Sequence, residues 1–345
     1  MTSNNSRNRR TAVILPALLL VLASPSANAE DLSSQVERAV KAGTSTWLTW
    51  RVPSAADGIA CCWNGKGSGE SKTCSLESDS YGMNMSRDRD GTPQIDTGLM
   101  VYAHLASGGV DKIRIFSNSC RVETGNENVR AIAGVAAAES VAYLETLVDR
   151  SDEGRAAKRR SDGALMAIAL HDEGSADRVL EHVARDSDTK SLRESAAFWL
   201  GSTRERPGYE ALVRLRSSDD ARFRQHLTFA FSQSKVAEAK ATLIDMARND
   251  PSGKVRSQAL FWIAQKAQKR ADADVIRSAV DDPDAEVKKQ AVFALSQIPN
   301  GEGVPDLIRV ARENKSREVR KQAMFWLGQS KDPRAMAFFE KILSQ

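Results

Sequence analysis

The sequence is poor in the residues that carry most enzymatic chemistry. Its 345 residues include only four histidines and four cysteines. They show none of the spacings of zinc sites, no nucleophile-elbow motif (G-x-S-x-G) occurs, and no glycine-rich stretch ends in the lysine-serine pair of a phosphate-binding loop. The histidines are His104, His171, His182 and His226. We therefore expect no catalytic residue with a recognisable signature, no metal site and no cofactor.

Long apolar runs are also missing, with one exception near the start of the chain. Residues 11–23 (TAVILPALLLVLA) are almost entirely apolar, but a membrane-spanning helix needs roughly 20 such residues. The run follows a basic stretch and ends before Ala27-Asn28-Ala29, the small-x-small pattern of a signal-peptidase site. We therefore expect residues 1–29 to be a cleaved signal peptide and the exported chain to have no membrane insertion afterwards. An uncleaved N-terminal anchor is the alternative.

An excess of basic charge is absent once this leader is set aside. The whole chain has 49 basic and 45 acidic residues. Three of the basic residues, Arg7, Arg9 and Arg10, lie in the leader and no acid does, which leaves 46 against 45. A nucleic-acid-binding protein shows a basic excess on one face. The near balance, together with export, argues against a nucleic-acid partner.

Cysteine is absent after residue 120. All four cysteines, Cys61, Cys62, Cys74 and Cys120, lie in the first third of the chain. An even, clustered set in an exported domain predicts disulfide bonds. Adjacent cysteines rarely bond each other, because a disulfide needs facing side chains. Two pairings stay open, 61–74 with 62–120 or 61–120 with 62–74.

The cysteine-bearing part begins with one helix signal and one strand signal. Residues 30–43 (EDLSSQVERAVKAG) have the spacing of a short helix. Residues 45–53 (STWLTWRVP) alternate in the manner of a strand and are rich in tryptophan and threonine.

A β-hairpin and a long loop complete this part. Residues 99–105 and 111–117 predict two strands that turn at Gly108-Gly109. Residues 61–92 are rich in glycine, serine and aspartate and predict a loop. We therefore predict a small disulfide-stapled α+β domain over residues 30–125.

The rest of the chain repeats itself with a fixed period. Residues 288–297 (KKQAVFALSQ) return almost unchanged as residues 320–329 (RKQAMFWLGQ). Aligned aromatic residues recur every 31 or 32 residues, at Phe198, Phe229, Phe261, Phe293 and Phe325. Each unit has two apolar stretches of helical period separated by breakers such as Pro299-Asn300-Gly301. A period of this length is the signature of a protein built from stacked repeats.

The turns and helix starts make the repeat type specific. Aspartate stands at the turns, and an apolar-basic pair opens the next helix. The residues concerned are Asp250, Arg256, Asp282, Lys288 and Arg320. This pattern resembles HEAT repeats, and the 32-residue period resembles their short, phycobilisome-lyase type. The resemblance implies a structural ladder in which each aspartate hydrogen-bonds to the base six residues later, and Asn314 before Arg320 departs from it by losing the charge.

The resemblance also implies the overall fold. We expect a mainly α protein, a right-handed α-solenoid of about six to seven HEAT-like helix pairs over residues 126–345, preceded by the small α+β domain. Residues 129–150 resemble a degenerate first unit, because the terminal repeats of a stack are atypical. Exported bacterial HEAT-repeat proteins resemble this arrangement, which implies a periplasmic location.

Two columns of side chains on the first helix of each repeat are candidates for partner binding. One column is Trp199, Trp262 and Trp326, and the other is Gln233, Gln265, Gln297 and Gln329. Tryptophans at this spacing usually belong to the core, and buried amides usually pair within the stack. The other interpretation is an aromatic and polar stripe that meets a partner, because exposed aromatic residues anchor interfaces.

The repeats favour binding over catalysis. Stacked repeats create extended concave surfaces that bind other molecules. We therefore predict an exported scaffold or adaptor that binds a protein partner in the cell envelope on the concave face of the solenoid, and not an enzyme.

Two alternatives place the function in residues 30–125. The first is an enzyme or enzyme-accessory protein, which predicts a pocket around Asp79, Asp88, Asp90 or His104. The second is a module that binds an envelope glycan or peptide, which predicts exposed tryptophans at Trp47, Trp50 or Trp63. Deleting the repeats would separate a scaffold, which loses binding, from an enzyme, which need not lose activity.

Overall fold

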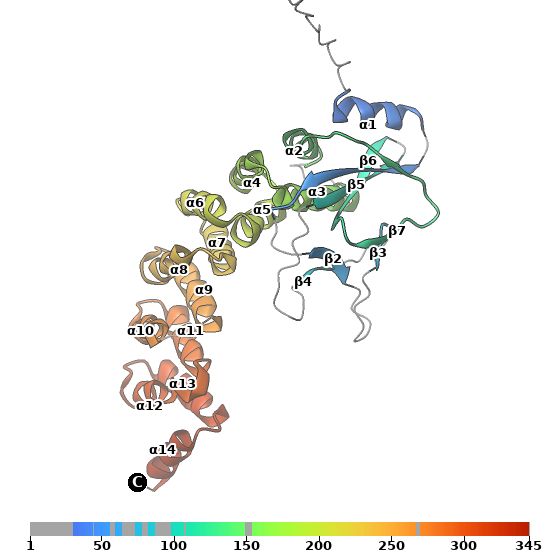
Figure 1. Ribbon diagram of the computed structural model, residues 1–345. Coiled ribbons are helices and arrows are strands. Elements are labelled where there is room, and N and C mark those ends of the chain that lie inside the picture. The colour runs from blue at the N-terminus through green and yellow to red at the C-terminus, as the bar shows by residue number, and fades with distance from the viewer. Residues whose placement is uncertain are drawn as a thin grey trace, which may run out of the picture.

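The computed structural model describes residues 30–43, 45–55, 59–63, 73–77, 82–86, 98–106, 108–148, 154–266 and 270–344. The predicted signal peptide lies outside these residues. The described chain begins with a helix and a mixed sheet and continues as a curved stack of helices (Figure 1).

A four-stranded sheet forms the core of the N-terminal part. Its strands are β1 (Thr46–Pro53), β5 (Gly98–Ala106), β6 (Gly109–Ser117) and β8 (Val129–Ala131), in the order β6-β5-β1-β8. The antiparallel β5–β6 pair confirms the predicted hairpin, and α1 (Leu32–Lys41) confirms the predicted first helix. β8 pairs parallel to β1.

Short strands lie where the sequence predicted a loop. β2 (Ile59–Trp63) pairs antiparallel with β4 (Gly82–Ser86), and β3 (Thr73–Ser75) pairs parallel with β7 (Arg121–Glu123). The prediction of a loop through residues 61–92 is therefore wrong for these segments. These segments are only three to five residues long, and their pairing depends on partners distant in the chain, which local propensity does not report.

A second, smaller apolar cluster surrounds Cys74. The cluster contains Trp47, Leu76 and Phe116, and Cys120 packs against it. Neither Cys74 nor Cys120 is a free thiol. The side chains of Cys61 and Cys62 lie outside the described ones, so both pairings stay predictions.

One helix, α2 (Ala137–Thr146), follows the sheet, and six helix pairs come after it within the described residues. They are α3 (Gly154–Leu170) with α4 (Gly174–Asp186), α5 (Lys190–Thr203) with α6 (Glu205–Leu215), α7 (Ala221–Gln233) with α8 (Ala237–Asn249), α9 (Gly253–Gln265) with α10 (Arg270–Ser278), α11 (Ala285–Ser296) with α12 (Val304–Glu313), and α13 (Arg317–Gln329) with α14 (Pro333–Leu343). The short 3-10 helix η1 (Ala279–Asp281) lies between α10 and α11, and η2 (Pro299–Gly301) lies between α11 and α12. The prediction of a degenerate helix pair at residues 129–150 is wrong, because this segment supplies β8 and α2.

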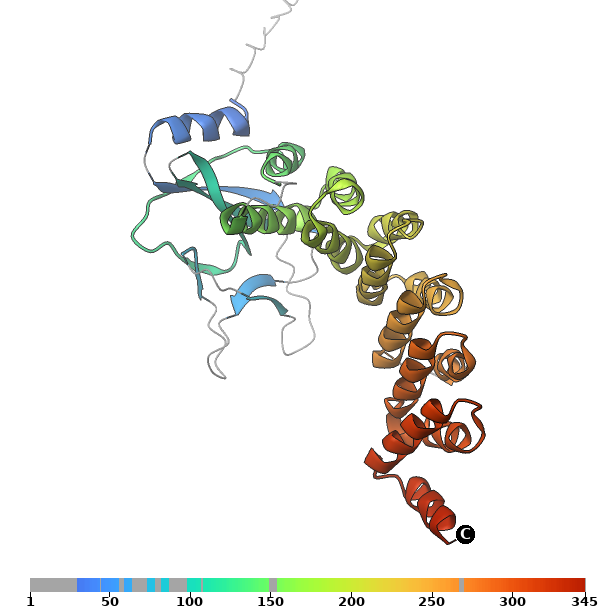
Figure 2. The ribbon, with the colours of Figure 1, turned by 180° about the vertical axis from the view of Figure 1, so that it is seen from behind.

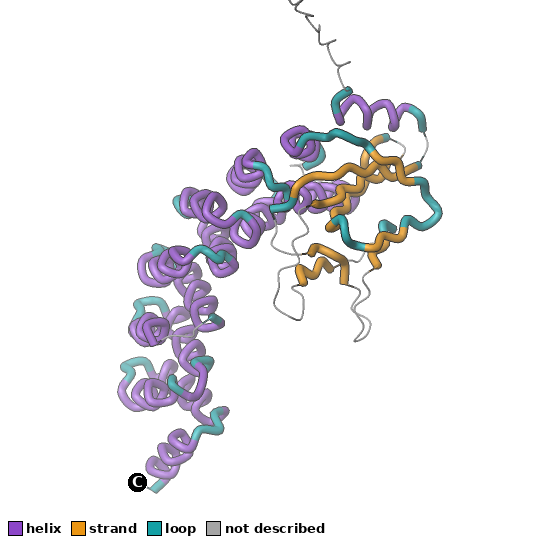
Figure 3. The backbone as a smooth tube through the Cα atoms, viewed as in Figure 1, coloured by secondary structure: helices purple, strands orange, loops and turns teal. Residues whose placement is uncertain are grey.

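The pairs stack in two layers. The helices α5, α7, α9, α11 and α13 pack on one another in sequence and line the inner side of the bend, whereas α6, α8, α10 and α12 lie on its outer side (Figures 1 and 2). Figure 3 shows that the loops join the layers at the ends of the helices, as in a repeat stack. Small side chains allow the close approach of the inner helices, since Ala196, Ala259, Ala291 and Ala323 are fully buried.

The sheet and the stack share one core. α3 packs against β6, and a Cβ on Gly163 would lie 2.7 Å from the Ile113 carbonyl oxygen, so only glycine fits there. The buried apolar side chains form one continuous cluster from Leu32 in α1 to Phe338 in α14. The predicted domain boundary at residues 125/126 stays a prediction, and the strand β8 that follows it belongs to the sheet.

A ladder of arginine–aspartate pairs runs along the turns between repeats. Arg224 donates from Nε and Nη2 to the Asp250 carboxylate (2.9 and 3.1 Å), and Arg256 does the same to Asp282 (2.9 and 2.8 Å). Both pairs are largely buried and bidentate, and bidentate arginine–carboxylate hydrogen bonds are stronger than bonds between neutral groups.

The carboxylates therefore pair with the base of the preceding repeat rather than with the base six residues later. The contact of Arg256 with Asp250 is made by Nη1 to the backbone carbonyl (2.8 Å), and Arg320 bonds in the same way to the Asn314 carbonyl (2.7 Å). The long arginine side chain spans adjacent repeats. Its Nε and Nη2 therefore reach the aspartate carboxylate at the turn of the following repeat, while Nη1 bonds to a backbone carbonyl in the turn before its own helix.

The last full rung of this ladder has Lys288 and Asn314 in place of the arginine and aspartate. We expect Lys288→Arg combined with Asn314→Asp to raise the free energy of unfolding by about 1–2 kcal/mol, because it completes a bidentate pair. Asn314→Asp alone should be destabilising, because Asn314 Nδ2 donates to the Val280 carbonyl (3.2 Å). Urea unfolding of the four proteins of this double-mutant cycle measures the coupling. Additive single changes would contradict the expectation.

Candidate partner-binding face

Aromatic rings form two runs on the inner helices. Phe198 on α5 stacks on Phe229 of α7 (ring centroids 5.6 Å apart), and Phe229 contacts Trp262 of α9 (4.8 Å). Further along, Phe293 on α11 contacts Trp326 of α13 (5.2 Å). The runs arise because the repeat places an aromatic residue at the same turn of each inner helix.

The tryptophan column lies at the margin of the core. Trp199, Trp262 and Trp326 are half-buried and pack against the core cluster without belonging to its fully buried set. Phe325, next to Trp326, is 56% exposed. Each of these tryptophan rings therefore packs on the stack with one part and keeps another part exposed to solvent.

The glutamine column is more exposed, and two of its amides hydrogen-bond within or at the end of their own helix. Gln233 and Gln297 each donate to the preceding serine hydroxyl (both 3.0 Å). Gln265 and Gln329 are exposed. The two predicted columns meet in a small cavity of about 180 Å³, which Trp326, Gln297 and Gln329 line.

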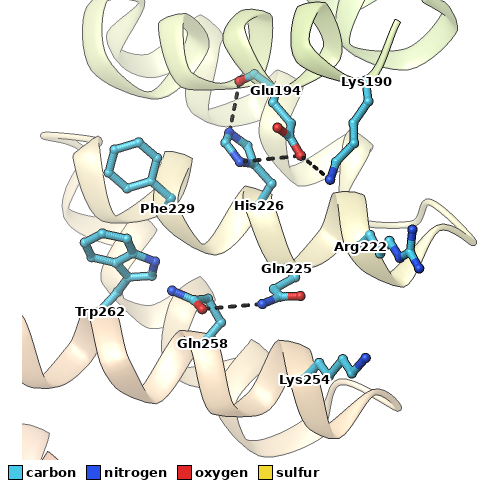
Figure 4. A pocket seen from close by; sticks show the side chains of 9 residues that line it. All are labelled: Lys190, Glu194, Arg222, Gln225, His226, Phe229, Lys254, Gln258 and Trp262. Atoms are coloured by element: carbon cyan, nitrogen blue, oxygen red, sulfur yellow. Dashed lines mark hydrogen bonds and ion pairs between the residues drawn. The ribbon is translucent and has the colours of Figure 1, made fainter. Parts of the chain in front are cut away.

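A larger cleft of about 440 Å³ crosses α5, α7 and α9 (Figure 4). Phe229 and Trp262 form an aromatic wall at one end, and Gln225 and Gln258 face each other across two helices (3.4 Å). The other lining residues are Lys190, Glu194, Arg222, His226 and Lys254. The cleft thus combines an apolar end, an amide pair and charged side chains.

The charged side chains of the cleft are mostly cationic. Lys190 pairs with Glu194 on its own helix (3.5 Å). His226 bonds through Nε2 to the Glu194 backbone carbonyl (3.0 Å), and burial lowers the pKa of its ring, so it is neutral at pH 7. Arg222 and Lys254 are exposed, and no described residue forms an ion pair with either side chain. The cleft therefore has three cations against one carboxylate.

Sequence analysis missed this cationic group. Arg222 and Lys254 lie seven residues before the aromatic residue of their helices, Glu286 and Glu318 continue this column, and Lys190 lies one residue off it. The alignment that reveals the aromatic column also contains the change of sign. It could have been recognised by comparing charges as well as apolar residues at equivalent positions.

The tryptophans of the sheet do not form a binding surface. Trp47 and Trp50 are 1% and 0% exposed. Both faces of β1 are covered, because Trp50 lies in the large core and Trp47 in the cluster around Cys74. The prediction of a glycan- or peptide-binding groove on these two residues is therefore wrong, and the Trp63 side chain lies outside the described ones.

His104 lies in a polar cluster that superficially resembles a catalytic triad. Its Nδ1 is 2.6 Å from Asp111 Oδ1, and its Nε2 is 3.2 Å from Ser45 Oγ. However, Glu127 Oε2 is only 2.8 Å from the same Nε2, and Ser45 donates to Glu127 Oε1 (2.9 Å). Both ring nitrogens therefore lie beside carboxylates, and the Ser45 hydroxyl hydrogen points to Glu127 rather than to the imidazole. The cluster is therefore better explained as a set of polar contacts that holds the segment before β8 against β5.

The remaining acidic candidates of the enzyme hypothesis, Asp79, Asp88 and Asp90, lie outside the described residues. Within the described ranges, no group of three or more histidines, cysteines, aspartates and glutamates could hold a metal ion. No described helix is both long enough and apolar enough to cross a bilayer.

Comparison with known proteins identifies the repeats. Residues 273–345 match the family model of HEAT repeats, which confirms the predicted resemblance. No curated protein sequence matches the chain.

Solved structures with related helical stacks are distant in sequence. YibA of Escherichia coli is 18% identical over 60% of this chain and 76% of its own, with a TM-score of 0.38. The complex of CpcE and CpcF of phycocyanin lyase from Nostoc is 16% identical over 60% and 81%, with a TM-score of 0.29. A designed armadillo repeat protein in complex with the peptide (KR)4 is 17% identical over 54% and 98%, with a TM-score of 0.31.

Proposed function

We propose, from the HEAT-repeat match of residues 273–345, that this chain is a scaffold that binds a protein partner along its inner helices. The proposal rests mainly on the runs of aromatic side chains along α5, α7, α9, α11 and α13. A half-buried ring is held rigidly by its own stack, so it presents apolar area to a partner at little entropic cost. The curved row of inner helices supplies the extended surface on which such anchors act together.

We further propose that the scaffold works after export, in the periplasm. The leader with its Ala27-Asn28-Ala29 site supports this, as does the absence of a free thiol at Cys74 and Cys120. Disulfide bonds persist in oxidising compartments. In this setting the partner is a protein of the cell envelope.

The test is cross-linked co-purification of the full-length tagged protein from the envelope fraction. Fragments are unsuitable, because cutting between the sheet and the stack would expose the core between β6 and α3. The variants are Phe325→Ala and Trp262→Ala, and the matched control is Val213→Ala, an exposed apolar residue on the outer helix α6. We expect the inner-face variants to retain at least about ten-fold less partner than the control, as for interface anchors.

The same preparation tests export. Mass spectrometry of the purified chain should show an N-terminus at Glu30 and, without reduction, one of the two predicted cysteine pairings. Equal retention of the partner by all variants would contradict the inner-face scaffold. An intact leader and reduced cysteines would contradict the periplasmic location.

A further inference from the structure

The charge of the inner face changes sign along the stack. Arg222 and Lys254 lie seven residues before the aromatic residue of their helices, and Glu286 and Glu318 stand at the same position in the next two repeats. Lys190 lies one residue off this position, eight residues before Phe198. Lys289 lies 3.1 Å from Glu286 and 3.0 Å from Glu318, so its single positive charge offsets only half of the negative charge of these two carboxylates. The last two repeats therefore offer no net attraction to an anion at this position.

The first three repeats differ in this respect. The Arg222 and Lys254 side chains are exposed and lie at the same end of the cleft, where neighbouring helices present them side by side (Figure 4). Exposed cations with no counter-charge attract and orient anionic ligands. The carboxylate of Glu194 is engaged by Lys190, so it opposes this attraction only in part.

The remaining surfaces of the cleft suit a polypeptide. The facing amides of Gln225 and Gln258 can donate to and accept from a peptide backbone, because each amide has both functions. Phe229 and Trp262 offer an apolar wall beyond them. Packed helices lie about 8–10 Å apart, so three of them span about 20 Å, which is about six residues of extended chain at roughly 3.3 Å each.

We propose that the cleft across α5, α7 and α9 binds a short, extended, acidic segment of a protein partner. Its carboxylates pair with Lys190, Arg222 and Lys254, and an apolar side chain packs on Phe229 and Trp262. This inference rests on the proposed scaffold function and names the chemistry of its partner. The segment ends before α11, because Glu286 would repel it.

The test uses the full mature chain and a fluorescein-labelled octapeptide of alternating glutamate and leucine, measured by fluorescence anisotropy. The comparison probes are the same peptide with lysine in place of glutamate and an oligothymidylate of eight nucleotides. The variant is Arg222→Glu with Lys254→Glu. The matched control is Lys315→Glu with Lys321→Glu, which makes the same change of net charge at exposed positions of the last repeat.

We expect the glutamate peptide to bind, the lysine peptide not to bind, and binding to weaken as salt rises. The Arg222→Glu, Lys254→Glu variant should weaken binding at least about ten-fold, whereas the control should stay within about two-fold. Trp262→Ala should weaken the glutamate–leucine peptide but not a peptide of glutamate and serine.

Three results would overturn the proposal. One is equal binding to the variant and the control, another is no measurable binding of the acidic peptide, and the third is tighter binding of the oligothymidylate, which would make the cleft a site for nucleic acid. Failure here is distinguishable from failure of the scaffold. A partner still captured by the Arg222→Glu, Lys254→Glu variant would leave the scaffold standing and remove only the acidic-segment site.

Discussion

Replacing Arg204 by methionine is expected to lower the free energy of unfolding by about 3 kcal/mol or more, because it removes the buried partner of the half-buried Asp177 carboxylate and of two backbone carbonyls. Arg204 follows α5 and is 8% exposed. Its Nε and Nη2 donate to the Asp177 carboxylate on α4 (2.6 and 3.2 Å). It also donates to the backbone carbonyls of His171 and Glu173, in the turn between α3 and α4.

Arg204 thus joins the turn of one repeat to the turn of the next. Methionine matches its apolar stem but supplies no donor, so the carbonyls of that turn lose their partners as well as Asp177. The matched control is Arg206→Met. The side chains of the Arg206–Glu238 pair (2.8 Å) are both 52% exposed, and exposed ion pairs contribute little to stability.

Urea unfolding followed by circular dichroism measures both variants. Amide exchange in α3 and α4 adds a local readout, since a stacked protein need not unfold in one step. A loss of stability in Arg204→Met no larger than that in Arg206→Met would show that the turn is held by packing alone.

Acidification from pH 7 to pH 4 is expected to weaken the fold through His171, by up to about 3 kcal/mol. His171 is fully buried at the end of α3. Its Nδ1 is 2.6 Å from the Ala167 carbonyl oxygen, and its Nε2 is 2.9 Å from Ser140 Oγ on α2. The same hydroxyl accepts from Trp50 Nε1 on β1 (2.7 Å).

These contacts define a neutral ring. Nδ1 must donate, because a carbonyl only accepts, and Nε2 accepts from the Ser140 hydroxyl. The pKa of His171 is lowered from 6.5 to about 4, chiefly by burial and also by the nearby Arg204, whereas the Ala167 carbonyl and Glu173 act in the opposite direction. A proton on Nε2 would break the hydrogen-bond chain from β1 through α2 to α3.

The direction of the pH effect follows from the pKa of His171, which is 6.5 in the unfolded chain and about 4 in the folded protein. The contribution of His171 is complete above pH 6.5. Below that pH the unfolded chain binds a proton that the folded chain does not, so stability falls until about pH 4, where the folded protein is also protonated. Unfolding free energies of the wild type and of His171→Gln, measured from pH 7 to pH 4, isolate this contribution.

The glutamine variant should be less stable at pH 7 and should lose its disadvantage as the pH falls, because glutamine does not titrate. The matched control is His182→Gln, since His182 is exposed on α4 beside Asp186 (2.7 Å). A constant gap between the wild type and His171→Gln across this range would contradict the expectation.

Much of the helical stack was predictable because its signals are local. The recurrence of Phe198 to Phe325 depends on spacing along the chain, and an amphipathic helix shows its buried face through residues three and four apart. The same holds for the hairpin at Gly108-Gly109, whose two strands are adjacent in sequence. The position of the tryptophan and glutamine columns on the inner helices follows from the same periodicity.

The candidate site was predictable only in part. The columns that include Trp262 and Trp326 were singled out, but the cleft across α5, α7 and α9 and its cations Arg222 and Lys254 were not. A cleft depends on how far apart adjacent helices lie and on which side chains leave space. The spacing of residues within one repeat predicts neither of these. The arginine–aspartate ladder shows the same limit, because the sequence indicated the residue types but not that Arg224 reaches Asp250 in the following repeat.

The sequence by itself determined that the chain repeats every 32 residues, folds as paired helices and places an aromatic column on one helix of each pair, because these properties depend on neighbours within a few turns. Only the tertiary structure decided that Trp47 and Trp50 are core, that β2 to β4 form within a glycine-rich stretch, and that His171 joins the sheet to the stack. Those outcomes depend on contacts between segments far apart in the chain. Their free energy comes from burial and from hydrogen bonds that form only when such segments meet.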